Sequence, residues 1–171
     1  MTDTPLWLPV VALFALLGLA YLGMWRGWRR RAHRHDLPPL TEVPPDPPAA
    51  LLETDAQFYG TTVSGYWLDR VVARGLGSRS RCRLVLSADG LDVHRPSASF
   101  RIPTPALREA RHDQGIAGKV VPPHGVLVVT WQHGDYTLDS GFRLAGPREH
   151  DAWVQTITRM ARSAPVEGEN A

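Results

Sequence analysis

The first long pattern in the chain is a stretch without a charged residue, from Pro5 to Trp25: PLWLPVVALFALLGLAYLGMW. About 20 apolar residues at ~1.5 Å each span the ~30 Å hydrocarbon core of a bilayer, and a helix of a soluble domain is rarely apolar on every face. A cleaved signal peptide is the alternative, but it needs a basic segment before the run, where only Asp3 stands. The pattern predicts a single transmembrane helix at about 5–25.

The charges that follow this run predict its orientation. Within the N-terminal segment 1–35, five arginines come directly after the apolar residues: Arg26, Arg29, Arg30, Arg31 and Arg34. Positive charge stays on the cytoplasmic side, so we expect a single-pass protein of the cell membrane with its N-terminus outside and its domain in the cytoplasm. These arginines are expected at the membrane surface, where they either only set the topology or also bind anionic lipid.

Residues 36–56 have a different composition. The segment DLPPLTEVPPDPPAALLETDA carries five acidic residues, no basic residue and six prolines. Because proline lacks an N–H and fixes φ, the composition predicts an extended acidic linker. A PxxP arrangement from Pro44 to Pro47 leaves open the alternative of an SH3-type ligand.

From residue 57 to 162 the hydrophobic period is two, which is typical of strands. Asp89-Gly90 separates the alternating runs 81–88 and 91–95 and predicts a hairpin in which Leu86 faces Val93. Gly134-Asp135 separates 126–133 from 136–142 and predicts a second hairpin, in which Trp131 pairs with Leu138. Weaker strand patterns at 58–63, 99–102 and 107–112 bring the expected number to about seven antiparallel strands.

The domain is expected to end in one helix. Gly146-Pro147 precedes a stripe of apolar residues in which Trp153, Ile157 and Met160 stand at positions i, i+4 and i+7. Residues 163–171 are polar and are expected to form a flexible tail.

The sequence offers little for catalysis or metal binding. The single cysteine, Cys82, excludes an intramolecular disulfide and is expected to point inward as an inert thiol. The seven histidines stand at no metal-ligand spacing, so we predict no metal site and no cofactor. Gly115-x-x-Gly118-Lys119 has too few residues between its glycines for a phosphate loop. No nucleophile motif or RNA-binding motif is recognisable, so we predict no catalytic residue, no enzyme activity and no nucleic-acid partner.

Arginines are dense in and after the connection between the first two strands of the domain. Guanidinium groups bind phosphate bidentately, so these residues are candidates for an anionic ligand such as a lipid headgroup, with a solvated basic face as the alternative. The candidate ligand-binding residues are Arg70, Arg74, Arg79, Arg81 and Arg83.

Seven strands followed by one amphipathic helix resemble the pleckstrin-homology superfold, a bent β-sandwich closed at one end by its C-terminal helix. The blocks GTTVSGYWLDR at 60–70, GIAGK at 115–119, VVTW at 128–131 and LDSGFR at 138–143 also resemble an actinobacterial family of single-pass membrane proteins with a PH-like domain. Proteins of that family are often labelled loosely as transporters or export proteins. The resemblance implies a mainly β, PH-like fold behind a membrane anchor.

These observations together predict a membrane-anchored, non-enzymatic PH-like interaction module that presents a protein-binding surface at the cytoplasmic face. The anchor contacts membrane lipid, and the expected protein partner has no identity in the sequence. An accessory subunit of an export or transport complex is the first alternative. An enzyme or phosphate-ligand binder that uses the arginine-rich loop is the second.

Overall fold

The structure is a computed structural model that describes residues 7–32, 37–66, 68–116, 119–120, 125–146 and 149–163. The chain divides into two compact units, Met1–Asp36 and Leu37–Ala171. The first unit contains one helix, α1 (Trp7–Ala32), which covers the uncharged run that the sequence predicts as helical. Among the described residues, no helix combines the length and the apolar character that crossing a membrane requires.

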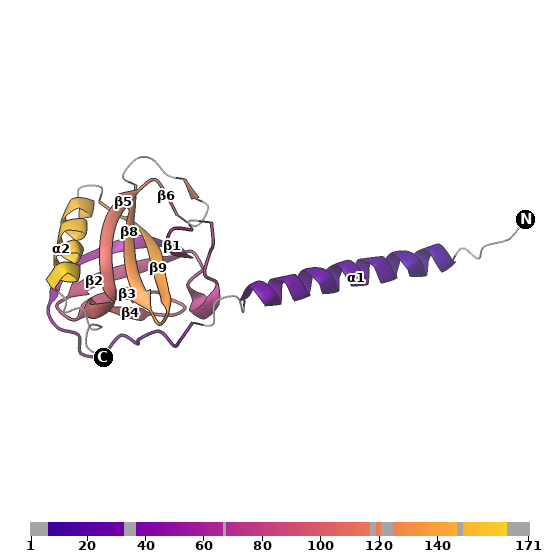
Figure 1. Cartoon of the computed structure of the whole chain (residues 1–171), viewed down its shortest axis with the longest axis horizontal. Coiled ribbons are helices and arrows are strands. Elements are labelled where there is room, and N and C mark those ends of the chain that lie inside the picture. The colour runs from indigo at the N-terminus through magenta and orange to yellow at the C-terminus, as the bar shows by residue number, and fades with distance from the viewer. Residues whose placement is uncertain are drawn as a thin grey trace, which may run out of the picture. The chain divides into compact units, whose positions relative to one another are not determined.

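The second unit is mainly β, as the hydrophobic pattern predicts. Seven strands form one antiparallel sheet in the order β4-β3-β2-β1-β9-β8-β5, and two short strands form a separate hairpin (Figure 1). The bounds of the strands are β1 (Ala50–Val63), β2 (Ser80–Ser87), β3 (Gly90–His94), β4 (Phe100–Pro103), β5 (Leu107–Asp113), β6 (Gly115–Ile116), β7 (Lys119–Val120), β8 (Val126–His133) and β9 (Tyr136–Leu144). Two 3₁₀ turns, η1 (Ala73–Gly75) and η2 (Thr104–Ala106), lie between strands. β1 is long enough to pair with β2 along its first half and with β9 along its second.

The first hairpin has the predicted faces but a register shifted by two residues. Leu86 pairs with Leu91 and Leu84 with Val93, whereas the sequence predicted that Leu86 faces Val93. Gly90 therefore belongs to β3, where its φ is +152°. A Cβ on Gly90 would lie 2.2 Å from the carbonyl oxygen of Ile102 in β4, so glycine is required there for the close approach of β4.

The second hairpin has the predicted register. Trp131 pairs with Leu138 and Leu127 with Phe142, and all four side chains are buried. A shift of one residue would have moved every one of these side chains to the other face of the sheet. The turn lies at Gly134, which has a φ of +56°, a conformation that glycine adopts without strain.

Helix α2 (Glu149–Ser163) closes the core, as the sequence predicts. It packs against β5 (Figure 1), with Trp153 and Ile157 buried and Met160 partly buried against the same core. The core contains the inward-facing residues of the sheet, including Phe58, Phe100 and Trp131, whose rings contact one another.

The segment 37–56, for which the sequence predicts an extended linker, is built into the second unit. Leu37 is buried in the main core, and its carbonyl oxygen accepts hydrogen bonds from Arg74 Nε and Nη2, both at 3.1 Å. The Thr41 carbonyl accepts a hydrogen bond from the backbone N–H of Arg101. β1 begins at Ala50, seven residues before the expected start of the domain. Proline composition therefore indicated the lack of regular structure in 38–48, but not that the segment packs on the domain.

A second, smaller core lies where β6 meets the main sheet. Tyr59, Ile116, Val126 and Val128 form this cluster, and a Cβ on Gly141 would lie 2.4 Å from Ile116 Cγ2. The absence of a side chain at Gly141 thus makes room for Ile116. The glycines at 115 and 118 were considered only as part of a phosphate loop, and the β6–β7 hairpin was not predicted.

Candidate functional site

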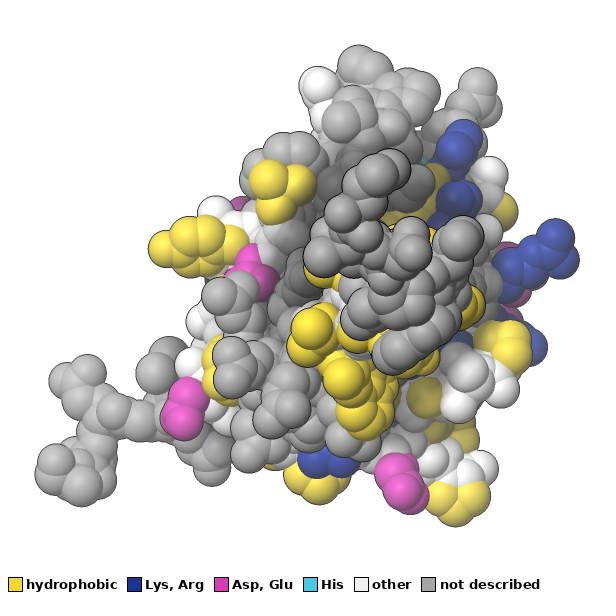
Figure 2. All heavy atoms as spheres, turned by 90° about the vertical axis from the view of Figure 1, so that its right-hand side faces the viewer, with side chains coloured by type: hydrophobic (Ala, Val, Ile, Leu, Met, Phe, Trp, Pro, Cys, Tyr) yellow, Lys and Arg dark blue, Asp and Glu magenta, His cyan; other side chains and the backbone are white. Residues whose placement is uncertain are grey.

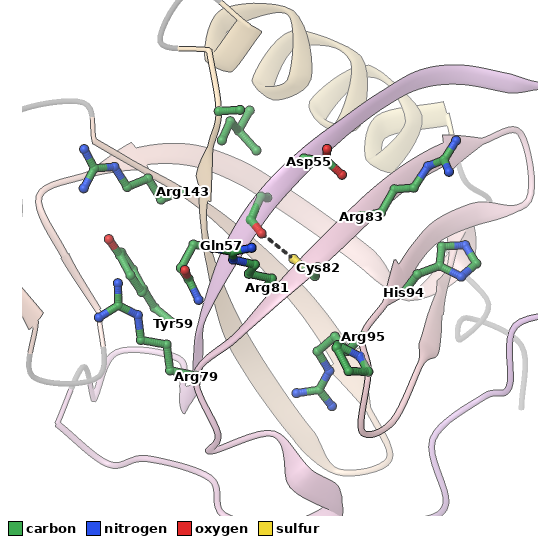
Figure 3. A pocket seen from close by; sticks show the side chains of 14 residues that line it. Asp55, Gln57, Tyr59, Arg79, Arg81, Cys82, Arg83, His94, Arg95 and Arg143 are labelled. Carbon is green, nitrogen blue, oxygen red and sulfur yellow. Dashed lines mark hydrogen bonds between the residues drawn. The ribbon is translucent and has the colours of Figure 1, made fainter.

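An arginine-rich hollow of about 830 Å³ lies on the second unit. It is bordered by residues of β1, β2 and β9 and by the connection that follows β3 (Figure 3). We call it the arginine hollow. It contains five arginines and one histidine against a single acidic residue: Arg79, Arg81, Arg83, Arg95, Arg143, His94 and Asp55. With His94 neutral, these side chains carry a formal charge of +4.

The centre of the hollow is a row of three residues on three neighbouring strands. Gln57 of β1 is paired with Arg81 of β2 on one side and with Arg143 of β9 on the other. Neighbouring strands lie about 4.8 Å apart, so the backbones of the two arginines are separated by roughly 10 Å. Both arginine side chains are exposed. The sheet therefore places two positive charges opposite one neutral residue.

These two arginines and Arg79 have no acidic partner among the residues that the structure describes. Arg79 instead lies over the ring of Tyr59, with its Cζ 4.9 Å from the ring centroid. Arg83 differs from them because it forms an ion pair with Glu53. In the view of Figure 3, Arg79, Tyr59 and Arg143 lie at one end of the hollow and Arg83 and His94 at the other.

Arg95 lies deeper and is only 6% exposed. Its Nε donates to the Ala98 carbonyl and its Nη1 to the Gly75 carbonyl, both at 3.0 Å, but its buried Nη2 has no hydrogen-bond partner among the described residues. The guanidinium carbon lies 4.7 Å from the centroid of Phe58 and 5.2 Å from that of Phe100. Burial lowers the pKa of Arg95, because the charged form is poorly solvated there. A buried cation that no described carboxylate pairs with is costly, and its charge adds to the positive potential of the hollow.

Cys82 also borders the hollow, but its sulfur donates to the Ala56 carbonyl at 3.5 Å. Burial raises the pKa of this thiol from its ordinary value of 9.0 to about 11. The thiolate is the nucleophilic form, so Cys82 is a poor nucleophile at neutral pH. This agrees with the expected inward-facing, inert cysteine.

The structure separates the five predicted ligand-binding arginines into two groups. Arg79, Arg81 and Arg83 border the hollow together, since alternate residues of an extended segment point to one face. Arg70 and Arg74 do not border it and bind backbone carbonyls instead: Arg70 Nη1 donates to Gly77, and Arg74 donates to Leu37. Arg74 also has a φ of +55°, so it shapes the η1 turn.

Sequence reasoning missed Arg95, Arg143 and His94 as members of this site. Arg143 lies beside Gln57 only because β1 and β9, the first and last strands in the sequence, pair with each other. The two residues are 86 positions apart in the sequence. No local pattern gives that pairing. Arg70 and Arg74 were included because arginines are dense in this connection, but both donate to backbone carbonyls, which a sequence pattern does not display.

The remaining candidates are placed as follows. Arg26, Arg29, Arg30 and Arg31 fall within α1, but their side chains, and Arg34 altogether, lie outside the described part of the chain. Among described residues, no group of three or more His, Cys, Asp or Glu side chains is placed to hold a metal ion. Figure 2 shows arginine or lysine side chains along one margin of the view.

A seven-stranded antiparallel sheet whose core is covered by a C-terminal helix is the architecture expected of a PH-like domain. The family model that matches is described as bacterial PH domain-like and covers residues 37–158. The chain therefore belongs to the bacterial PH domain-like family. The matched range begins at Leu37, the residue at which the second compact unit begins.

The chain also aligns with solved structures. A chain of the 8S snRNP assembly intermediate aligns with a TM-score of 0.51 and 9% identity, covering 78% of this chain and 97% of that one. A pleckstrin homology domain solved in solution aligns with a TM-score of 0.41 and 16% identity, over 74% of this chain and 97% of that one. The pleckstrin homology domain of the human KIAA0053 protein aligns with a TM-score of 0.40 and 15% identity, covering 74% of this chain and 100% of that one. The search of curated proteins finds no match.

Proposed function

We propose that this PH-like domain is a non-enzymatic interaction module that presents the arginine hollow to an anionic partner. The observation that carries the proposal is the row Arg81–Gln57–Arg143, in which two exposed cations flank a neutral side chain. Such a row is a source of electrostatic repulsion in the free domain. A partner with complementary negative charge relieves that repulsion and is guided to the hollow by the same field.

Other charges in the domain support this reading by contrast. Arg101 and Arg111 are both paired with aspartates of the same sheet, at 2.6–2.8 Å. The domain thus neutralises arginines that serve its own stability, while Arg79, Arg81 and Arg143 are left without a carboxylate among the described residues. Because burial raises the pKa of the Cys82 thiol, this residue supplies little thiolate for covalent chemistry at neutral pH.

Co-purification from detergent-solubilised membranes tests the proposal. The full chain with Arg79, Arg81 and Arg143 changed to Gln is compared with a control in which the exposed Arg108, Arg159 and Arg162 are changed to Gln. Both variants lose three positive charges, so a general charge effect is matched. We expect the hollow variant to recover at least about tenfold less partner than the control variant. The reason is that hydrogen bonds to charged groups contribute roughly 1.5–3 kcal/mol each.

Equal recovery of partner by the two variants would contradict the proposal. The identity of the partner also separates the alternatives. Recovery of channel or permease subunits would favour an accessory subunit of an export or transport complex. Recovery of soluble proteins through the hollow would favour an interaction module that brings them to the membrane.

We further propose that the N-terminal unit anchors the domain in the cell membrane, with the domain on the cytoplasmic side. In support, the described side chains of α1, Val11 and residues 13–25, are all exposed and none is charged. Exposed apolar groups along such a stretch of helix need an apolar environment to cover them. The arginines that follow favour the cytoplasmic side for the second unit.

Fusions at the C-terminus test this topology, because they leave both compact units intact. Alkaline phosphatase fused there is expected to be inactive and a green fluorescent protein to be fluorescent, since the first folds only outside the reducing cytoplasm. High phosphatase activity in the membrane fraction would place the domain on the outside. Recovery of the fluorescent fusion in the soluble fraction would contradict the proposed membrane anchor.

A further inference from the structure

We infer that the group recognised in the arginine hollow is a phosphate, held between Arg81 and Arg143, with Arg79 and the buried Arg95 adding positive charge. This inference rests on the proposed function, because it names the ligand chemistry of the same site. It depends on how many cations gather, on how they are spaced, and on the buried charge of Arg95.

The number of cations distinguishes phosphate from carboxylate. This domain shows what one carboxylate needs: Asp92 is satisfied by a single guanidinium, which donates through Nε and Nη2 at 2.6 and 2.7 Å. The hollow instead gathers five arginines, of which only Arg83 has an acidic partner, Glu53, among the described residues. A phosphate monoester carries a charge of about −1.5 to −2 and three strong acceptor oxygens, so it accepts from several guanidinium groups at once.

The spacing also suits a group of this size. The roughly 10 Å between the backbones of Arg81 and Arg143 allows both long side chains to converge on one tetrahedral anion above Gln57. Gln57 itself offers an amide donor between them. Nearer the end of the hollow, the guanidinium of Arg79 lies over the Tyr59 ring, which limits its freedom and holds its charge close to the site.

Arg95 supplies the second, independent observation. Arg95 is only 6% exposed, its guanidinium lies over the rings of Phe58 and Phe100, and one of its buried nitrogens has no described residue to accept from it. A dianion in the hollow would compensate this charge, because attraction between charges is stronger where water is excluded. Binding is therefore expected to stabilise the folded domain as well as to neutralise its surface.

Phosphate of this kind comes from two sources, a soluble phosphorylated molecule or a lipid headgroup, and the hollow recognises the chemistry that they share. Its volume of about 830 Å³ lies within the range of sites for small molecules. The experiment therefore needs one arm for each source.

The experiment is calorimetric titration of inorganic pyrophosphate into the full chain held in micelles of a neutral detergent. Citrate at the same ionic strength serves as the carboxylate control, and Arg159→Gln as the control variant outside the hollow. We expect pyrophosphate to bind at least about tenfold more tightly than citrate, and Arg81→Gln or Arg143→Gln to weaken it by about tenfold or more. Both positions are exposed, so neither change threatens the fold, and the melting temperature without ligand checks this.

The second arm repeats the titration in mixed micelles that contain phosphatidic acid. A weaker apparent affinity for pyrophosphate would show that a lipid phosphate competes for the hollow, and an unchanged affinity would assign the hollow to soluble phosphate. The inference is overturned if pyrophosphate does not bind, if citrate binds equally well, or if Arg81→Gln and Arg143→Gln bind like Arg159→Gln. In those cases a selective loss of partner by the hollow variant would still support the proposed function, so the two failures are distinguishable.

Discussion

Replacing Trp153 with alanine is expected to destabilise the second unit by about 3–5 kcal/mol, the usual cost of truncating a buried tryptophan. Trp153 is 2% exposed and lies in the main core, where α2 packs against β5. Its removal leaves a cavity that the surrounding strands fill only in part. The melting temperature of the full chain, measured by circular dichroism, should fall by roughly 10 °C or more.

Arg159→Ala is the matched control for this prediction, since Arg159 lies on the exposed face of the same helix. It should melt within about 2 °C of the unmodified chain, because surface substitutions seldom exceed 0.5 kcal/mol. A Trp153→Ala variant that melts with the control would mean that α2 does not close the core.

Replacing Asp92 with alanine is expected to cost a similar amount, about 3–5 kcal/mol, for an electrostatic reason. Asp92 is completely buried and accepts two hydrogen bonds from Arg101, which is itself 8% exposed. Removing the carboxylate leaves the buried guanidinium with only the exposed Asp89, 3.9 Å away, as a counter-charge. Urea denaturation of the full chain should show a lower midpoint with little change in slope, since the surface exposed on unfolding is nearly the same.

The double variant Asp92→Leu with Arg101→Met separates charge from packing. Replacing both members of a buried ion pair with apolar groups is often neutral, so the double variant should recover most of the stability that Asp92→Ala loses. If it is no more stable than the single variant, the loss comes from packing or from the backbone hydrogen bond between Arg101 and Thr41 rather than from the unpaired charge.

The fold was predictable where a turn and a face pattern constrain each other locally. In the second hairpin, Gly134 marks the turn and the alternation of Trp131 and Leu138 fixes the face, so the register followed. In the first, Asp89-Gly90 was interpreted as the turn itself. The structure uses Gly90 as a strand residue against Ile102, because β4 packs too closely for a side chain. A shift of two residues keeps the same side chains on the buried face. The hydrophobic pattern therefore fits the predicted and the observed register equally well.

The site was predictable only along one strand. The spacing of Arg79, Arg81 and Arg83 places them on one face of an extended segment, and the structure gathers all three. Arg143 enters through the pairing of β1 with β9, and Arg95 through the turn after β3. Both contacts are tertiary, and neither leaves a local trace in the sequence.

The burial of Leu37 shows the same limit at the start of the domain. The residues after it are rich in proline, which correctly indicates the absence of regular hydrogen bonding. Packing of Leu37 depends on Arg74, which lies 37 positions later and donates twice to its carbonyl oxygen. Amino-acid composition does not reveal a partner so distant in the sequence. The compact unit therefore begins at Leu37, twenty residues before the expected start of the domain at residue 57.

Site-specific photo-crosslinking in living cells tests most directly whether the arginine hollow is the interaction surface. A photoreactive phenylalanine analogue replaces Gln57, in the centre of the hollow, or Gln155, on the exposed face of α2. The account predicts a discrete crosslinked product from position 57 that disappears when Arg79, Arg81 and Arg143 are changed to Gln, and no such product from position 155. A product from position 155 alone, or one from position 57 that persists without the three arginines, would contradict it.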